Sequence, residues 1–224
     1  AIEYLTKAVQ LEPNTINIWN NLALCLMKIG RTEEAIEIFK KGTLKDPTHN
    51  NVYSNFLLHL NYMPDVESSE IHAEALKWAH IQAAPSRAWN DHDNVPDPDR
   101  KLRIGYISPD FKRHSVMFFF NSLLMGHDRE HFELFGYGNV EGIDNVTEAT
   151  AKKFDYYRNI KGMDDKKAAE LIRADKVDIL VEMAGHTKGN SLSVLSYKPA
   201  PIQVSYLGYP ATTGMSQIDY RFTD

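Results

Sequence analysis

The chain has 224 residues, 43% of them hydrophobic and 25% charged, and its net charge at pH 7 is -5. These values are typical of a soluble globular protein with one or two domains, and the negative charge argues against DNA or RNA as a partner. A single cysteine excludes an internal disulfide framework, and the longest apolar stretch, residues 116–120, is far too short for a transmembrane helix.

The N-terminal part carries a repeat with a period of about 34 residues, which is typical of tetratricopeptide (TPR) helix pairs. The one full copy has its signature residues at Trp19, Leu22, Gly30, Ala35, Phe39 and Pro47. The second half of a copy precedes it, and Tyr53 and Phe56 begin another copy, which fails at Pro64. Because residue 1 already lies inside a repeat, we expect the chain to be an internal piece of a longer protein.

Helical periodicity in this part predicts five helices, over residues 1–11, 16–29, 32–45, 49–62 and 66–84. Residues 85–100 contain several prolines, aspartates and asparagines and predict a linker with little to bury. We therefore expect TPR repeats and junction helices over 1–84, a linker over 85–100 and a second domain over 101–224.

Strands and helices alternate in the second domain. The predicted strands cover 101–107, 132–137, 177–182 and 202–207, and residues 220–224 also read as a strand. The predicted helices cover 116–126, 145–157 and 164–174. Such alternation indicates a parallel sheet with helices on both faces, in which ligands bind at the loops beyond the carboxyl ends of the strands.

Three of these loops are rich in small and polar residues, over 108–114, 184–190 and 207–214. We expect them to converge on one cleft, where backbone N–H groups approach a ligand. Each residue taken alone also has a structural interpretation. His114 is also consistent with a helix N-terminus, Lys188 with a solvated charge and Gly208 with a simple turn. Only their joint placement after successive strands favours a binding site.

The sequence lacks the motifs of several common catalytic and metal-binding sites. No His-Glu-x-x-His pair, Walker lysine loop, Gly-x-Gly-x-x-Gly fingerprint or serine-hydrolase elbow is present. The acidic triplet at residues 97–99 precedes the first predicted strand, so we interpret it as structural. We therefore expect no metal site.

Three segments of the second domain, residues 103–114, 184–189 and 199–210, resemble the catalytic region of the O-linked N-acetylglucosamine transferase family. Their details are most similar to bacterial members and to the SPINDLY-like branch. Together with the TPRs, the resemblance covers essentially the whole chain. It implies a two-lobed GT-B fold, of which this chain holds the last repeats and most of the first, Rossmann-like lobe. The expected fold class is therefore α followed by α/β.

The resemblance also implies an activity. The family transfers a sugar from a nucleotide donor to Ser or Thr of proteins, with inversion and without a metal. We expect a cytoplasmic protein O-glycosyltransferase that uses UDP-N-acetylglucosamine or GDP-fucose, needs no other cofactor, and holds protein or peptide acceptors on its TPRs. Residues 1–224 alone are expected to be inactive, because the donor site of a two-lobed enzyme lies between its lobes.

The match of motifs implies roles for seven residues. Asp110 and His114 are similar to family residues that are required for activity. The other five are expected to bind substrate. His186 and Lys188 fall in the loop that lines the donor-sugar and acceptor side, and the residues that pack around the donor are Leu207, Gly208 and Pro210. Animal members carry a tyrosine at the position of His186, which leaves both donors open. The alternative function is a TPR interaction scaffold whose α/β lobe lacks catalysis.

Overall fold

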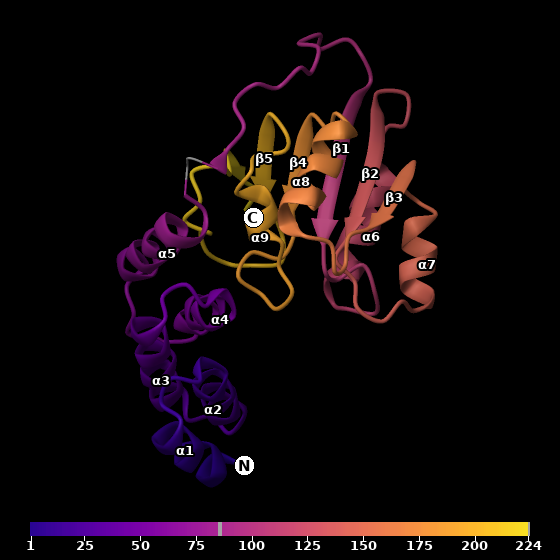
Figure 1. Ribbon diagram of the computed structural model, residues 1–224. Helices are drawn as coiled ribbons and strands as arrows, with labels where there is room; N and C mark the ends of the chain where they lie inside the picture. Colours follow the sequence, from indigo (N-terminus) through magenta and orange to yellow (C-terminus); the bar gives the residue numbers. More distant parts are fainter. Residues whose placement is uncertain (85–86, 224) are drawn as a thin grey trace. The chain divides into compact units, whose positions relative to one another are not determined.

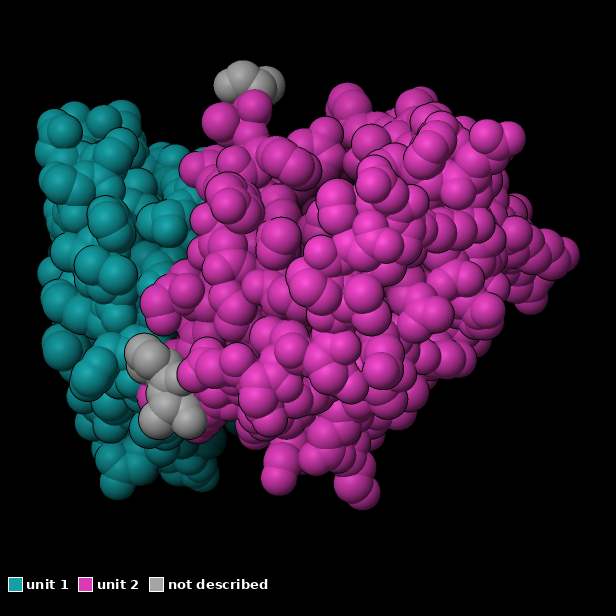
Figure 2. Space-filling model, turned by 90° about the horizontal axis from the view of Figure 1, so that it is seen from above, with its two compact units in different colours: residues 1–82, 186–188, 210–214 teal, residues 83–185, 189–209, 215–224 magenta. Residues whose placement is uncertain are grey.

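The structure is a computed structural model, which describes residues 1–84 and 87–223. Pro85 and Ser86 of the predicted linker, and Asp224, lie outside the described residues. The chain divides into two compact units, which Figure 2 distinguishes by colour. Unit 1 comprises residues 1–82, 186–188 and 210–214. Unit 2 comprises residues 83–185, 189–209 and 215–224. Each unit thus contains segments that are far apart in the sequence.

Five helices build most of unit 1, and each agrees with a predicted helix to within one or two residues at either end. They are α1 (Ile2–Leu11), α2 (Ile16–Lys28), α3 (Thr32–Lys45), α4 (Asn50–Leu60) and α5 (Ser68–Gln82) (Figure 1). The repeat residues explain their packing. Trp19, Ala35 and Phe39 are buried, and a Cβ on Gly42 would lie 3.1 Å from the Val52 side chain, so the glycine favours close packing of α3 and α4. The expected helical repeats are therefore confirmed.

Unit 2 contains a six-stranded parallel sheet in the order β3-β2-β1-β4-β5-β6, which is the doubly wound order of the Rossmann fold. Its strands are β1 (Leu102–Ser108), β2 (Phe132–Gly138), β3 (Tyr156–Asn159), β4 (Ile179–Glu182), β5 (Ile202–Ser205) and β6 (Tyr220–Arg221). Its helices are α6 (Val116–Gly126), α7 (Asn145–Ala151), α8 (Asp165–Ala174) and the short α9 (Leu192–Leu195). The predicted fold class, helical repeats followed by a Rossmann-like parallel sheet, is confirmed.

Helices cover both faces of the sheet in unit 2. In Figure 1, α6 lies behind the sheet, and α8 and α9 lie in front of it. The buried face of α6, with Phe120 and Leu124, belongs to one apolar cluster with Tyr106 and Leu134 of the sheet and with Met183, which directly follows β4. Within the described residues, no helix is long and apolar enough to cross a membrane.

The predicted helix over 145–157 is wrong in its second half. The helix begins as expected, because Asp144 accepts from the backbone N–H of Thr147 at 2.8 Å and forms a capping box. It ends at Ala151, however, and residues 156–159 form β3. Asp155 explains the change, because its backbone and side chain both hydrogen bond to Leu134 of β2. Contacts with a neighbouring strand, and not the local period, therefore decide this segment.

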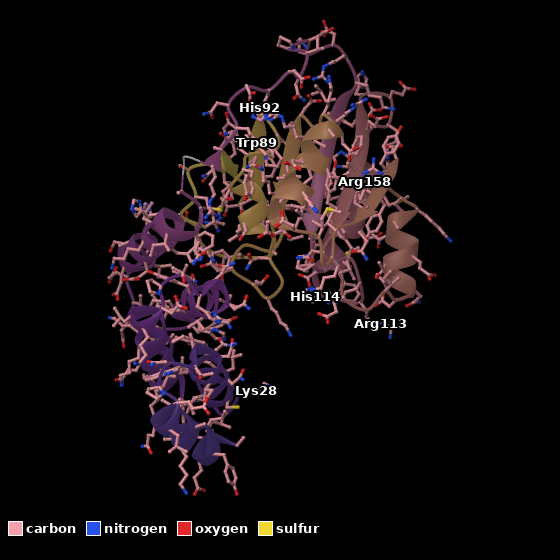
Figure 3. The ribbon with its side chains drawn as sticks, in the orientation of Figure 1. Lys28, Trp89, His92, Arg113, His114 and Arg158 are labelled. Atoms are coloured by element: carbon pink, nitrogen blue, oxygen red, sulfur yellow. The ribbon has the colours of Figure 1, made fainter. Side chains whose placement is uncertain are left out.

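Most of the linker over 87–100 is exposed, as expected, but several contacts attach it to the rest of unit 2. The ring of Trp89, labelled in Figure 3, packs 5.5 Å from that of Tyr197. Arg100 and Asn94 both donate to the carboxylate of Asp178, at 2.5–2.7 Å. The linker is thus held at its end by a charge network.

We expect Asp178→Ala to lower the free energy of unfolding by about 3 kcal/mol, because it leaves the Arg100 guanidinium without its carboxylate. Chemical denaturation measures the change. Asp91→Ala is the matched control, because it breaks an exposed ion pair with Arg173 and should change stability far less. Equal losses in the two variants would contradict the network.

Candidate functional site

The carboxyl ends of the central strands of unit 2 lie level with one another. Ile107 of β1 pairs with Glu182 of β4, which pairs with Ser205 of β5. The residues that follow these three therefore leave the sheet along one edge. Figure 3 shows Arg113 and His114 beyond the end toward which β1 points.

The loop after β1 brings the two predicted catalytic residues together. Its first turn is fixed by Ser108, whose hydroxyl accepts from the backbone N–H of Asp110 at 3.0 Å. The Nδ1 atom of His114 lies 3.8 Å from Oδ2 of Asp110, close enough for electrostatic attraction but too far for a hydrogen bond. The side chain of Asp110 is 13% exposed and that of His114 is 42% exposed.

Burial raises the pKa of the Asp110 carboxyl, and the nearby His114 and Lys112 oppose this shift. The Nδ1 atom of His114 also accepts from the backbone N–H of Val116 at 3.3 Å, so in the neutral ring the proton resides on Nε2. A largely buried carboxyl thus lies beside an accessible imidazole. This is a suitable arrangement for moving a proton to or from a bound hydroxyl.

Glu182, which the sequence analysis missed, is a second carboxyl at this edge. It is buried at the end of β4, and its oxygens accept from the backbone N–H groups of Ala184 at 2.6 Å and Gly185 at 2.8 and 2.9 Å. Burial raises its pKa to about 7, the two backbone hydrogen bonds oppose the shift, and the charge of Asp110 adds to it. An acidic residue that ends an otherwise apolar strand was the available signal.

The turn after β5 gives Gly208 a packing role, and its contact with a donor stays a prediction. The N–H of Gly208 donates to the carbonyl of Tyr206 at 3.0 Å, and Leu207 between them has a φ of 75°. This is a γ-turn in a strained conformation, and its positive φ belongs to Leu207, not to the glycine. A Cβ on Gly208 would lie 1.9 Å from the carbonyl oxygen of Met183, so close packing against β4 requires the glycine.

His186 is a buried part of unit 1. Its Nε2 donates to the carbonyl of Thr213 at 3.1 Å, which leaves Nδ1 to accept from the hydroxyl of Ser54 at 3.2 Å. The ring meets Trp78 edge-on, with 4.5 Å between the ring centroids. Burial lowers the pKa of His186 to about 4, so the ring is neutral at pH 7.

The comparisons with known proteins decide the family. Residues 49–224 match the model of glycosyl transferase family 41, and residues 1–57 match that of the tetratricopeptide repeat. The chain belongs to glycosyl transferase family 41. The resemblance that the sequence motifs indicated is thereby confirmed.

Individual members of the family are similar over most of the chain. A probable UDP-N-acetylglucosamine–peptide N-acetylglucosaminyltransferase SPINDLY from Petunia hybrida is 39% identical over 183 residues, which are 80% of this chain and 20% of the relative. A UDP-N-acetylglucosamine–peptide N-acetylglucosaminyltransferase from Caenorhabditis elegans is 37% identical over 127 residues, 56% of this chain and 11% of the relative.

Among solved structures, a mutant O-GlcNAc transferase from Thermobaculum terrenum matches with a TM-score of 0.92 and 31% identity, over 99% of this chain and 42% of that chain. The chain thus spans about a fifth of the length of the curated relatives that it matches.

In this family 41 chain, only some of the seven predicted site residues lie together. Asp110 and His114 are neighbours in unit 2, and Leu207 and Gly208 share one turn of unit 2. The other three belong to unit 1, where Lys188 and Pro210 are exposed and His186 is buried. The ring of His186 is buried and both of its nitrogens are hydrogen-bonded, and its role in substrate binding stays a prediction. Convergence of the three loops stays a prediction.

The buried His186 should make stability depend on pH. Its folded pKa of about 4 lies below the unfolded value near 6.5, so its contribution is present above about pH 6.5 and is lost as pH falls toward 4. The loss should reach about 3 kcal/mol. Chemical denaturation of the wild type and of His186→Gln from pH 7 to pH 4 isolates this loss, because the variant lacks the His186 contribution to the pH dependence of the unfolding free energy. His72→Gln, at an exposed position of α5, should keep this contribution.

Proposed function

We propose that this chain is the repeat region and first catalytic lobe of a protein O-glycosyltransferase that transfers N-acetylglucosamine from UDP-N-acetylglucosamine to Ser or Thr. The observation that carries the proposal is the Asp110–His114 pair at the carboxyl edge of a Rossmann-order sheet, in a family 41 chain. The names of the plant and nematode relatives support the same donor. The repeats of unit 1 would hold the acceptor polypeptide, since stacked helix pairs present extended binding surfaces.

The proposed reaction is a single displacement with inversion. The acceptor hydroxyl oxygen attacks the anomeric carbon, and the bond from that carbon to the diphosphate oxygen breaks, with the electron pair leaving on the diphosphate. The hydroxyl proton goes to a base, for which we propose Nδ1 of the exposed His114 imidazole, the ring nitrogen that carries no proton. To take the proton, Nδ1 gives up the long hydrogen bond, 3.3 Å, that it accepts from the N–H of Val116. The Asp110 carboxylate, 3.8 Å away, stabilises the imidazolium that forms. No step in this scheme requires a metal ion.

A donor screen on the full-length protein tests the proposal. The protein is incubated with acceptor peptides and with radiolabelled UDP-N-acetylglucosamine, other UDP-sugars or GDP-fucose, and transfer to peptide is counted. We expect transfer from UDP-N-acetylglucosamine above all others. Transfer from GDP-fucose alone would contradict the proposed donor but support the glycosyltransferase activity. Neither transfer nor donor hydrolysis with any sugar nucleotide would favour the alternative, a TPR scaffold without catalysis.

A further inference from the structure

A groove in unit 2 runs between α6 and α7, starting at His114. Its volume is about 570 Å³. Two contacts fix its ends. Arg113 hydrogen bonds to Asn145 at the start of both helices, and Lys153 hydrogen bonds to Asn121 beyond the end of α7. Between these ends, the lining includes the side chains of Met117, Phe118, Val146 and Ala149. The groove is therefore apolar along its length and polar at both ends.

The charges of this groove have one sign. Its charged or titratable lining residues are Arg113, His114 and Lys153, and no carboxylate lines it. Among the described residues, the side chains of Arg113 and Lys153 donate to neutral amide oxygens, those of Asn145 and Asn121. Asp144 lies near the first end, where it accepts from the backbone N–H of Arg113. The Lys153 end is thus the more positive one, in a chain whose net charge is -5.

Phe118 gives the groove an exposed apolar wall. Its side chain is 83% exposed although it lies in the first turn of a helix whose opposite face is core. An exposed ring beside an apolar groove gains from being covered, by roughly 25 cal/mol for each Å² that is buried. The occupant should therefore bring an apolar side chain as well as negative charge.

We propose that this groove binds the acceptor polypeptide next to the modified Ser or Thr, with an apolar side chain against Phe118 and an acidic side chain at Lys153. This rests on the proposed function. His114 precedes α6 by two residues, and at the rise of a helix the seven residues from it to Asn121 span about 10 Å, which is the length of about three residues of extended peptide. The acidic residue should thus lie about three positions from the acceptor hydroxyl. A diphosphate fits less well, because its adjacent charges would meet cations at opposite ends of an apolar groove.

Binding of fluorescent peptides to the full-length protein tests the groove without requiring catalysis. Two pairs of Ser-containing peptides are compared. Within a pair, the peptides are identical except that one carries Glu and the other Lys three positions from the serine. In one pair this position precedes the serine, and in the other it follows. We expect the Glu peptide of one pair to bind at least fivefold more tightly than its Lys partner. Lys153→Glu should reverse this preference. Lys152→Glu, which changes a neighbouring exposed lysine outside the groove, should keep it.

A second pair of variants tests the apolar wall. Phe118→Asp should raise the Kd and the acceptor KM at least tenfold. Phe119→Asp should change them less than twofold, because Phe119 is also exposed but does not line the groove. Equal effects of the two variants, or a peptide preference that Lys153→Glu leaves intact, would overturn the inference. So would a rise in donor KM that matches the rise in acceptor KM, which would assign the groove to the sugar nucleotide.

The outcomes separate this inference from the proposed function. Suppose that the wild type shows neither transfer nor donor hydrolysis, but that Lys153→Glu reverses the peptide preference. This result would contradict the proposed enzymatic function and support peptide binding in the groove. Transfer that neither Lys153→Glu nor Phe118→Asp changes would support the enzymatic function and contradict peptide binding in the groove.

Discussion

Gly208→Ala is expected to destabilise unit 2 by at least about 3 kcal/mol, the upper part of the usual range for overpacking. The added Cβ would lie 1.9 Å from the carbonyl oxygen of Met183 and 3.2 Å from the Cα of Ala184. Both are backbone atoms, so neither can turn aside as a flexible side chain does. The end of β4 and the turn after β5 must separate, and Leu207 in its strained conformation would be released with them. Chemical denaturation of the purified variant measures the loss.

Gly126→Ala is the control for this experiment. Gly126 ends α6, and a Cβ there meets nothing within 4 Å, so the stability should change by less than about 1 kcal/mol. The sequence analysis predicted that Gly208 lets backbone approach the donor. A Gly208→Ala variant of wild-type stability with a raised donor KM would support that interpretation and contradict the packing argument.

His114→Ala is expected to lower kcat of the full-length enzyme about 10²-fold or more, as loss of a positioned acid–base group typically does. Its melting temperature should change little, because the ring is 42% exposed and makes one long hydrogen bond, from the N–H of Val116. Steady-state kinetics with peptide acceptors and differential scanning fluorimetry give the two readouts.

His131→Ala serves as the matched substitution, since His131 is exposed and lies 2.8 Å from its own carboxylate partner, Asp128. It should keep both activity and stability. A His114→Ala variant that melts far below the wild type yet keeps its specific activity would show that His114 is structural. In that case the proton would need another acceptor, and Asp110→Asn would be the next variant to assay.

The sequence predicted those parts of the fold that local patterns decide. The repeat residues from Trp19 to Pro47 predicted the helix pairs, and the alternation after residue 101 predicted the central strands. β3 was missed because its residues are held by β2, through Asp155 and Leu134, and have no strand period of their own. Tertiary contacts of this kind leave no local signal.

In the candidate site too, the sequence predicted local neighbours but not contacts between distant segments. Asp110 and His114 are four residues apart in one loop, so their proximity followed from the motif alone. The role of His186 depends on Ser54, 132 residues earlier, and no spacing reveals that pair. The backbone atom that a Cβ on Gly208 would meet belongs to Met183, which directly follows β4, and no local pattern reveals that contact either. The sequence therefore predicts neighbours within one loop but not packing between loops.

The discontinuity of unit 1 has a consequence for how the protein acquires its structure during synthesis. Helices α1 to α5 are complete once residue 82 has been made, but Trp78 and Ser54 still lack His186. His186 in turn lacks Thr213 until the chain has grown by a further 27 residues. The repeats must therefore wait, with part of their core uncovered, until strands β1 to β5 have been made. Such a delay exposes apolar surface, so a chaperone that shields the repeats should raise the yield of native protein.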